Sequence, residues 1–387
     1  MGFIQMKKLF FAVIVACVCI FSVHAEDSAD VQGILDEYAR IYGKEISQVT
    51  DELENVDFDK FIPEFQAENI ISDIATGKTV FSVTTILEKG IEVLFGEMEN
   101  TVRLLVVIIA ISILSTYLIN IQSSFQNKGA TNAAFFVCYL VVSGISSAAL
   151  LEVVGCGKVL VENISVFMRM LVPVIMVSLV SSGAPVTATT FELVMVGIIE
   201  LTEWIVEVFF IPMLMMSAAL SIVNNLSETM EAGKLVQFMN KTIKWGIGIV
   251  MTVFVGVMNL QGIVSGSADG LAVKITKFAT SNLIPVVGGA LAETVETVIN
   301  CGAVIKNAVG VLGIIIVVLM AAIPLLKTAA CLIMFRLCAA ILQPIADKRI
   351  VKSVSDISDS VSGIFGLVAA VTVMFVIMLT IIIKIVV

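Results

Sequence analysis

Apolar runs of roughly twenty residues, separated by short polar segments, follow one another from residue 101 to the end of the chain. A helix needs about twenty such residues to cross a bilayer, so the pattern predicts an all-α, polytopic integral membrane protein with about six to eight spans. Two stretches are ambiguous, because 191–223 is too long for one span and 332–342 is short and broken by Arg336. The clear runs are 102–121, 133–151, 166–182, 245–264, 309–326 and 364–383, and the polar segment 152–162 is expected to connect the second and third of them.

The loops between these runs give conflicting indications of topology. Lys128 follows the first run, and Lys348, Arg349 and Lys352 precede the last one, so the positive-inside rule places both loops in the cytoplasm. The polar segment 224–244 also carries three lysines, but a strict count of the predicted spans places it on the opposite side. The sequence therefore leaves the number of spans and the side of the carboxyl terminus open.

The first 25 residues have the pattern of a secretory signal peptide. Lys7 and Lys8 precede an apolar stretch, and Val23-His24-Ala25 is a small-x-small site that predicts cleavage between Ala25 and Glu26. An uncleaved first span is an alternative, which we disfavour because the apolar stretch is short for a bilayer. A lipoprotein signal ending at Cys17 is a weaker third interpretation.

Residues 26–100 differ from the rest of the chain by their charge. They contain eighteen acidic and five basic residues, whereas the part from residue 101 onward is slightly positive. Apolar residues recur here at helical spacing, but the region is too short and polar for a large core. We predict three parts: a signal peptide (1–25), a small acidic helical extracytoplasmic region (26–100) and a multi-span membrane domain (101–387).

The long stretch 191–223 carries an acidic face. On a continuous helix its glutamates fall within roughly 80° of one another, opposite Val, Met, Ile, Leu and Phe. One interpretation is an interfacial helix to about residue 208 followed by a short span, and the other is a tilted span whose glutamates line a wet cavity. We favour the first, because charge at bilayer depth is costly. The four residues are Glu192, Glu200, Glu203 and Glu207.

A second polar stripe lies on the helix that follows Ile284-Pro285. Its members fall within roughly 60° of one another, and Lys306 points roughly the opposite way from Glu296. The stripe fits either a re-entrant or interfacial helix that faces loops and water, or a helix that faces a pore or another subunit. Its members are Glu293, Glu296, Asn300 and Asn307.

Composition argues against an enzyme. Hydrophobic residues make up 58% of the chain and charged residues 14%, and His24 is the only histidine. Cleavage after Ala25 would leave no histidine for acid–base catalysis, a catalytic triad or a metal site. Nucleotide-binding and HExxH motifs are absent from the sequence, as is a basic patch for nucleic acid, and none of the seven cysteines forms a CxxC pair. We therefore expect no catalytic residues, cofactor or metal.

An ordered set of short segments resembles the stage III sporulation protein AE family. The resemblance is closest over about residues 245–345, and it extends loosely through 170–173 and the general layout of signal, polar region and spans. The segments are Trp245-Gly246-Ile247-Gly248, Gln261-Gly262, Asp269-Gly270, Lys277-Phe278, Asn282, Ile284-Pro285-Val286-Val287-Gly288, Glu293, Thr297-Val298-Ile299, Ile305-Lys306-Asn307-Ala308-Val309-Gly310, Pro324 and Gln343-Pro344.

The resemblance implies a membrane component of the mother-cell/forespore channel or secretion-like complex that endospore formation and late forespore gene expression require. It implies a multi-pass location in the mother-cell membrane around the forespore, with the acidic region in the intermembrane space. The implied partners are other stage III sporulation A proteins and a forespore membrane protein, with the bilayer and further copies of this chain as additional candidates. Two alternatives remain: a secondary transporter, which should show an inverted repeat, and a passive scaffold for ring-forming partners.

Overall fold

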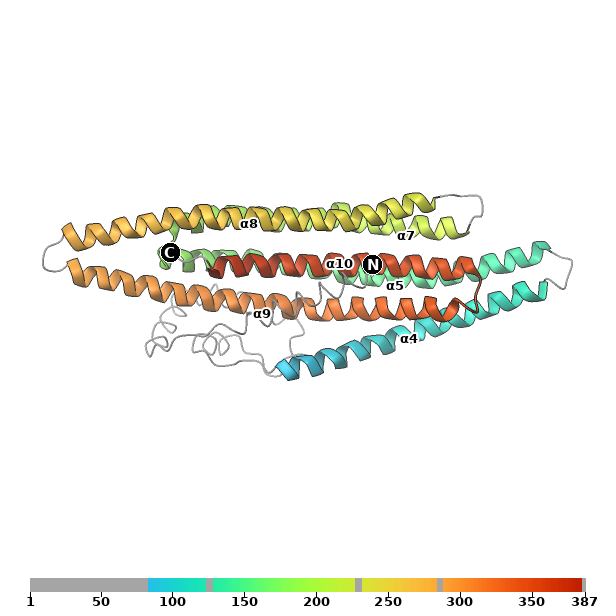
Figure 1. Cartoon of the computed structure of the whole chain (residues 1–387). Coiled ribbons are helices and arrows are strands. Elements are labelled where there is room, and N and C mark those ends of the chain that lie inside the picture. Colours follow the sequence, from blue (N-terminus) through green and yellow to red (C-terminus); the bar gives the residue numbers. More distant parts are fainter. Residues whose placement is uncertain (1–82, 123–127, 227–231, 284–287, 385–387) are drawn as a thin grey trace.

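The computed structural model describes residues 83–122, 128–226, 232–283 and 288–384. Within these ranges every regular element is a helix, and the long helices lie side by side in an elongated bundle (Figure 1). This confirms the predicted all-α fold. The signal peptide predicted at 1–25, its cleavage site and most of the acidic region 26–100 lie outside the described residues.

The described helical paths cross the bundle six times. Each of these six paths is long and apolar enough to cross a membrane, judged by length and composition. The number agrees with the lower end of the predicted range of six to eight spans. The elements are α4 (Val83–Gln122), α5 (Lys128–Ser181), α6 (Pro185–Ile205), the π-helical segment η2 (Val206–Phe210), α7 (Ile211–Leu226), α8 (Gly233–Leu283), α9 (Gly288–Leu342) and α10 (Lys348–Lys384).

Two pairs of predicted apolar runs each form one continuous helix, so the boundaries within each pair were wrong. The runs 133–151 and 166–182 belong to the single helix α5, and the segment 152–162, which we expected to be a connection, is helical. The runs 309–326 and 332–342 likewise belong to α9. Ion pairs explain why the helix can continue through these charged residues. Glu152 of α5 pairs with Lys327 of α9, and Lys158 of α5 pairs with Glu207.

The ambiguous stretch 191–223 is one continuous helical path. The π-helical segment η2 joins α6 to α7 without a turn, which is the arrangement of the tilted-span interpretation. The buried side chains explain the wider turn, since Val206, Phe210, Leu214 and Ala218 recur every four residues. A stripe with this repeat drifts around an α-helix of 3.6 residues per turn, and a π turn compensates for the drift.

Successive helices run in opposite directions, so the connections alternate between the two ends of the bundle (Figure 1). The facing ends of α4 and α5, of α7 and α8, and of α9 and α10 lie at one end. The α5–α6 turn at 182–184, the facing ends of α8 and α9 and the carboxyl-terminal end of α10 lie at the other. The lysines of 224–244 therefore begin at the same end as Lys128 and Lys348. The topological conflict over this segment arose because two spans, 133–151 and 166–182, were expected where the structure has the single helix α5.

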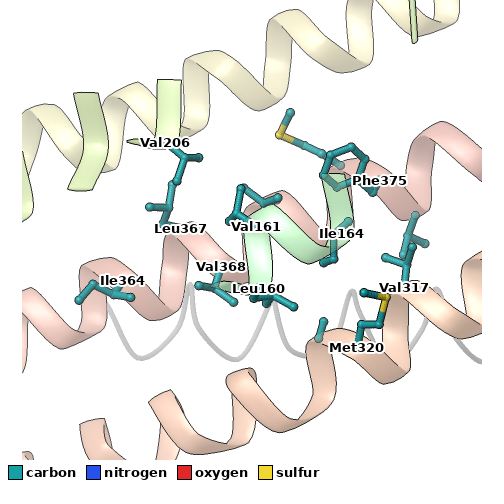
Figure 2. Close-up of a cluster of buried hydrophobic side chains, with 14 of the residues drawn as sticks. Leu160, Val161, Ile164, Val206, Val317, Met320, Ile364, Leu367, Val368 and Phe375 are labelled. Carbon is teal, nitrogen blue, oxygen red and sulfur yellow. The ribbon is translucent and has the colours of Figure 1, made fainter. Parts of the chain in front are cut away.

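The core forms where α5, α9 and α10 meet. Figure 2 shows Leu160, Val161 and Ile164 of α5 between Met320 of α9 and Val368 of α10, and all of these side chains are buried. Helix α10 has no charged residue from 361 to 383, a length that fits the hydrocarbon core of a bilayer. The depth of a side chain on another helix can therefore be judged from the α10 residues that lie beside it.

The helices are longer than a bilayer is thick. Helix α5 has 54 residues, which corresponds to about 80 Å, against about 30 Å of hydrocarbon. At one end the α4–α5 hairpin extends beyond the turn between α9 and α10 (Figure 1). Large apolar side chains on this hairpin are exposed, including Val106, Tyr117 and Val137. The hydrocarbon of one bilayer therefore cannot cover the full length of these helices.

Candidate functional site

A ladder of ion pairs runs along the contact between α5 and the α6–η2 path. Lys158 Nζ lies 2.5 Å from Glu207 Oε1, and Arg169 Nε lies 2.8 Å from Glu200 Oε1. A second guanidinium nitrogen of Arg169 donates to Glu203. The two helices run antiparallel, so the order from Lys158 to Arg169 along α5 matches the order from Glu207 back to Glu200 on the other path. We call these five residues the α5–α6 ladder.

The ladder lies at the depth of the uncharged part of α10. Thr202, Val206 and Phe210, which flank the ladder glutamates, line a small space together with Leu367 and Val371 of α10. The Lys158 and Glu207 side chains are 51% and 52% exposed, so the ladder lies on the outer surface of the bundle. Charged groups at this depth need protein or water around them, because lipid chains cannot solvate them.

The predicted acidic face is therefore only part of the arrangement. Glu200, Glu203 and Glu207 all pair with basic residues of α5, while Glu192 lies exposed on the same helix and takes no part in the ladder. Sequence reasoning missed Lys158 and Arg169. Their spacing of eleven residues, close to three helical turns, was the available signal, but the assumed break at 152–162 hid it.

The polar stripe after Ile284-Pro285 is described only in part. Asn300 and Asn307 are both exposed, while the neighbouring Ile305 and Lys306 are buried, which agrees with the helical wheel for these two asparagines. The side chains of Glu293 and Glu296 lie outside the described residues, although their backbone belongs to α9. The role of the stripe stays a prediction.

A pocket of about 390 Å³ lies between α5 and α9. Glu152 Oε1 and Lys327 Nζ, 2.7 Å apart, form an ion pair at the pocket, and Pro324 interrupts the hydrogen-bond pattern of α9 beside it. Sequence reasoning could not find this pocket, because its two walls are separated by more than 150 residues of chain. Its lining consists of Glu152, Gly155, Cys156, Val159, Leu160, Asn163, Met320, Pro324 and Lys327.

A polar cluster connects α7 to α10 near the end that carries the 343–347 turn. Asp356 accepts hydrogen bonds from the hydroxyl of Ser221 and, at 2.7 Å, from the amide of Asn225. The Tyr139 hydroxyl donates to the Ile222 carbonyl at 2.7 Å. These bonds satisfy buried polar groups and fix α7 against α5 and α10, so the cluster stabilises the bundle.

In the described ranges, no group of three or more His, Cys, Asp and Glu side chains is arranged to hold a metal ion. What the described residues do form is compensated charge at membrane depth, at two places along α5. One is the ladder on its α6 side, and the other is the Glu152–Lys327 pair on its α9 side.

Comparison with known proteins gives one consistent result. The family model described as stage III sporulation protein AE matches residues 65–386. The stage III sporulation protein AE of Bacillus subtilis (strain 168) is 29% identical over 322 residues, which cover 83% of this chain and 80% of that protein. No solved structure matches the chain.

Proposed function

The chain belongs to the stage III sporulation protein AE family, and from this membership we propose that it is the polytopic membrane component of a channel or secretion-like complex between mother cell and forespore. In this proposal the complex supports late forespore gene expression, and the chain lies in the mother-cell membrane around the forespore. The other stage III sporulation A proteins and a forespore membrane protein are its partners.

The α5–α6 ladder is the observation that carries this proposal. Its charged groups are half-exposed on the side of the bundle, level with the uncharged part of α10. A protein surrounded by lipid alone would leave them in hydrocarbon, whereas a subunit of a larger assembly places them against protein or a water-filled path. The exposed apolar side chains of the projecting α4–α5 hairpin support the same conclusion.

The alternation of the helices supports the proposed orientation. With six crossings, the start of α4 and the end of α10 lie at the same end of the bundle. The lysine-bearing connections lie at the opposite end, which the positive-inside rule assigns to the cytoplasm. The acidic region 26–100 would then face the intermembrane space, where the partners of the proposed complex meet.

An in-frame deletion of the gene in its host tests the proposal directly. We expect normal vegetative growth and loss of heat-resistant spores, with development stopping after engulfment. Normal numbers of heat-resistant spores in the deletion strain would overturn the proposal and leave the secondary transporter as the preferred function.

The polar stripe separates a channel component from a passive scaffold. We expect that replacing Glu293 and Glu296 together with Ala reduces spore yield at unchanged membrane levels of the protein, because a wet helix face loses its polar groups. Replacing Glu88 and Glu92, which are exposed on α4, serves as the matched control. A normal spore yield from the stripe variant would favour the scaffold.

A further inference from the structure

The pocket between α5 and α9 opens onto the outer surface of the bundle. The Glu152 side chain is 61% exposed and Val159 is 54% exposed, whereas Leu160 and Met320 are buried. In Figure 2, Leu160 lies on the side of α5 that faces the α9 helix carrying Met320, so these two side chains form the inner wall of the pocket. The mouth therefore faces the surroundings of the bundle and not its core.

The pocket lies level with the part of the uncharged α10 segment that is nearest Asp359. Gly157, next to Cys156, packs against Ile364 and Val368 of α10. These residues lie about 10 Å along the helix from Asp359, the last charged residue before the uncharged segment. Asp359 interacts electrostatically with Lys244 and Arg336, so a belt of charge marks this edge of the hydrocarbon.

The lining combines one positive and one negative group with an apolar wall. The Lys327 ammonium and the Glu152 carboxylate are 2.7 Å apart, and Val159, Leu160, Met320 and Pro324 provide the apolar surface. The volume of about 390 Å³ is within the range of small-molecule sites. It suits a headgroup and the first part of an acyl chain, with the remainder of the chain in the bilayer.

We propose that this pocket binds one phospholipid whose headgroup carries both a phosphate and an ammonium, as phosphatidylethanolamine does. The phosphate replaces Glu152 as the partner of Lys327, and the headgroup ammonium becomes the partner of the Glu152 carboxylate. Both protein charges therefore stay compensated when the lipid enters, which charges at membrane depth require. A headgroup with a phosphate but no ammonium would leave Glu152 beside a second negative charge.

Retention of lipid by the purified full-length protein tests the proposal. The protein is reconstituted in nanodiscs containing equal amounts of phosphatidylethanolamine and phosphatidylglycerol, extracted in mild detergent and examined by native mass spectrometry. We expect one retained phospholipid, with phosphatidylethanolamine preferred by about tenfold, the factor that one charge-assisted hydrogen bond supplies. Equal retention of the two lipids, or none, would overturn the proposal.

Substitutions of Glu152 and Lys327 test whether these two charges cause the preference for phosphatidylethanolamine. Glu152→Gln should lower the preference for phosphatidylethanolamine by about tenfold, and Lys327→Gln should lower the retention of both lipids. The Lys158–Glu207 pair is a matched control, since it also joins α5 to a neighbouring helix but does not line this pocket. A Lys158→Gln or Glu207→Gln variant that changes retention as much as the pocket variants would contradict the assignment.

The cysteine in the pocket gives a second readout that needs no change to the charged pair. Cys156 and Cys138 are both half-buried on α5, but only Cys156 lines the pocket. In chains that keep one of the two cysteines, phosphatidylethanolamine should slow maleimide labelling at Cys156 and leave Cys138 unaffected, in comparison with nanodiscs of phosphatidylglycerol alone. Equal labelling of Cys156 in the two lipids would overturn the proposal.

Free phosphoethanolamine distinguishes the lipid from a soluble zwitterion. If it protects Cys156 in phosphatidylglycerol nanodiscs as well as the lipid does, the pocket binds a soluble solute and the lipid proposal fails. All of these measurements use purified protein and none depends on spores, so their failure would leave the proposed sporulation function untouched.

Discussion

Gly302 of α9 lies directly against the backbone of Ser181, at the point where α5 ends. A methyl group at position 302 would come within 2.5 Å of the Ser181 carbonyl carbon and 2.5 Å of the Ser182 nitrogen. The backbone itself fills the space, so no side chain can move aside to make room. This close approach sets how α9 passes the turn between α5 and α6, where Gly183 has a positive φ of 81°.

Replacing Gly302 with Ala should destabilise the protein. The added methyl group must push the backbone of α9 away from the α5–α6 turn, and overpacking of this kind costs about 1–3 kcal/mol. The measurement is the thermal stability of the purified protein in detergent, followed by size-exclusion chromatography.

Gly248→Ala is the matched control, because Gly248 lies in α8 with nothing within 4 Å of its missing Cβ. Alanine favours a helix over glycine by about 1 kcal/mol, so this variant should be as stable as the original chain or more so. A Gly302→Ala protein as stable as the Gly248→Ala protein would contradict the close approach.

The ladder should show energetic coupling between α5 and α6. In a double-mutant cycle of Arg169→Gln and Glu203→Gln, we expect a coupling energy of about 0.5–3 kcal/mol, because the two side chains are in direct contact. The same cycle with Glu192→Gln in place of Glu203→Gln should be additive, since Glu192 is outside the ladder. Equal coupling energies in both cycles would show that the ladder contact does not cause the coupling between Arg169 and Glu203.

Asp356 should be needed as a hydrogen-bond acceptor. Asp356→Ala leaves the donors of Ser221 and Asn225, which are almost completely buried, without this acceptor, at a cost of about 1–3 kcal/mol for each buried group. Asp356→Asn keeps one acceptor oxygen and should lose less stability. Thermal stability in detergent measures both variants, and an Asn variant as unstable as the Ala variant would argue that the negative charge is what matters.

The two ends of the bundle should lie on opposite sides of the membrane. Single cysteines at positions 186 and 384 should both react with a membrane-impermeant maleimide added to intact cells, and a cysteine at 345 should react only after the membrane is opened. The physical reason is the even number of crossings, with the basic connections inside. A cysteine at 345 that reacts in intact cells would reverse the orientation.

The sequence by itself determined that the chain is a helical membrane protein, and it placed four glutamates at helical spacing between 192 and 207. Both follow from local properties, since apolar run length and helical periodicity depend only on residues near one another in the chain. The likeness to the sporulation family could also be recognised from the sequence, because it is carried by short ordered segments.

The tertiary structure alone decided where the helices are continuous and which charges meet. Residues 152–162 look like a loop in isolation, but they stay helical because Glu152 and Lys158 find partners on α9 and η2. The partner of Glu152 is Lys327, far along the chain, and no periodicity within α5 can specify it. The span count, the ladder and the pocket all depend on such long-range pairs, because in a bilayer the position of a charge is settled by the neighbour that compensates it.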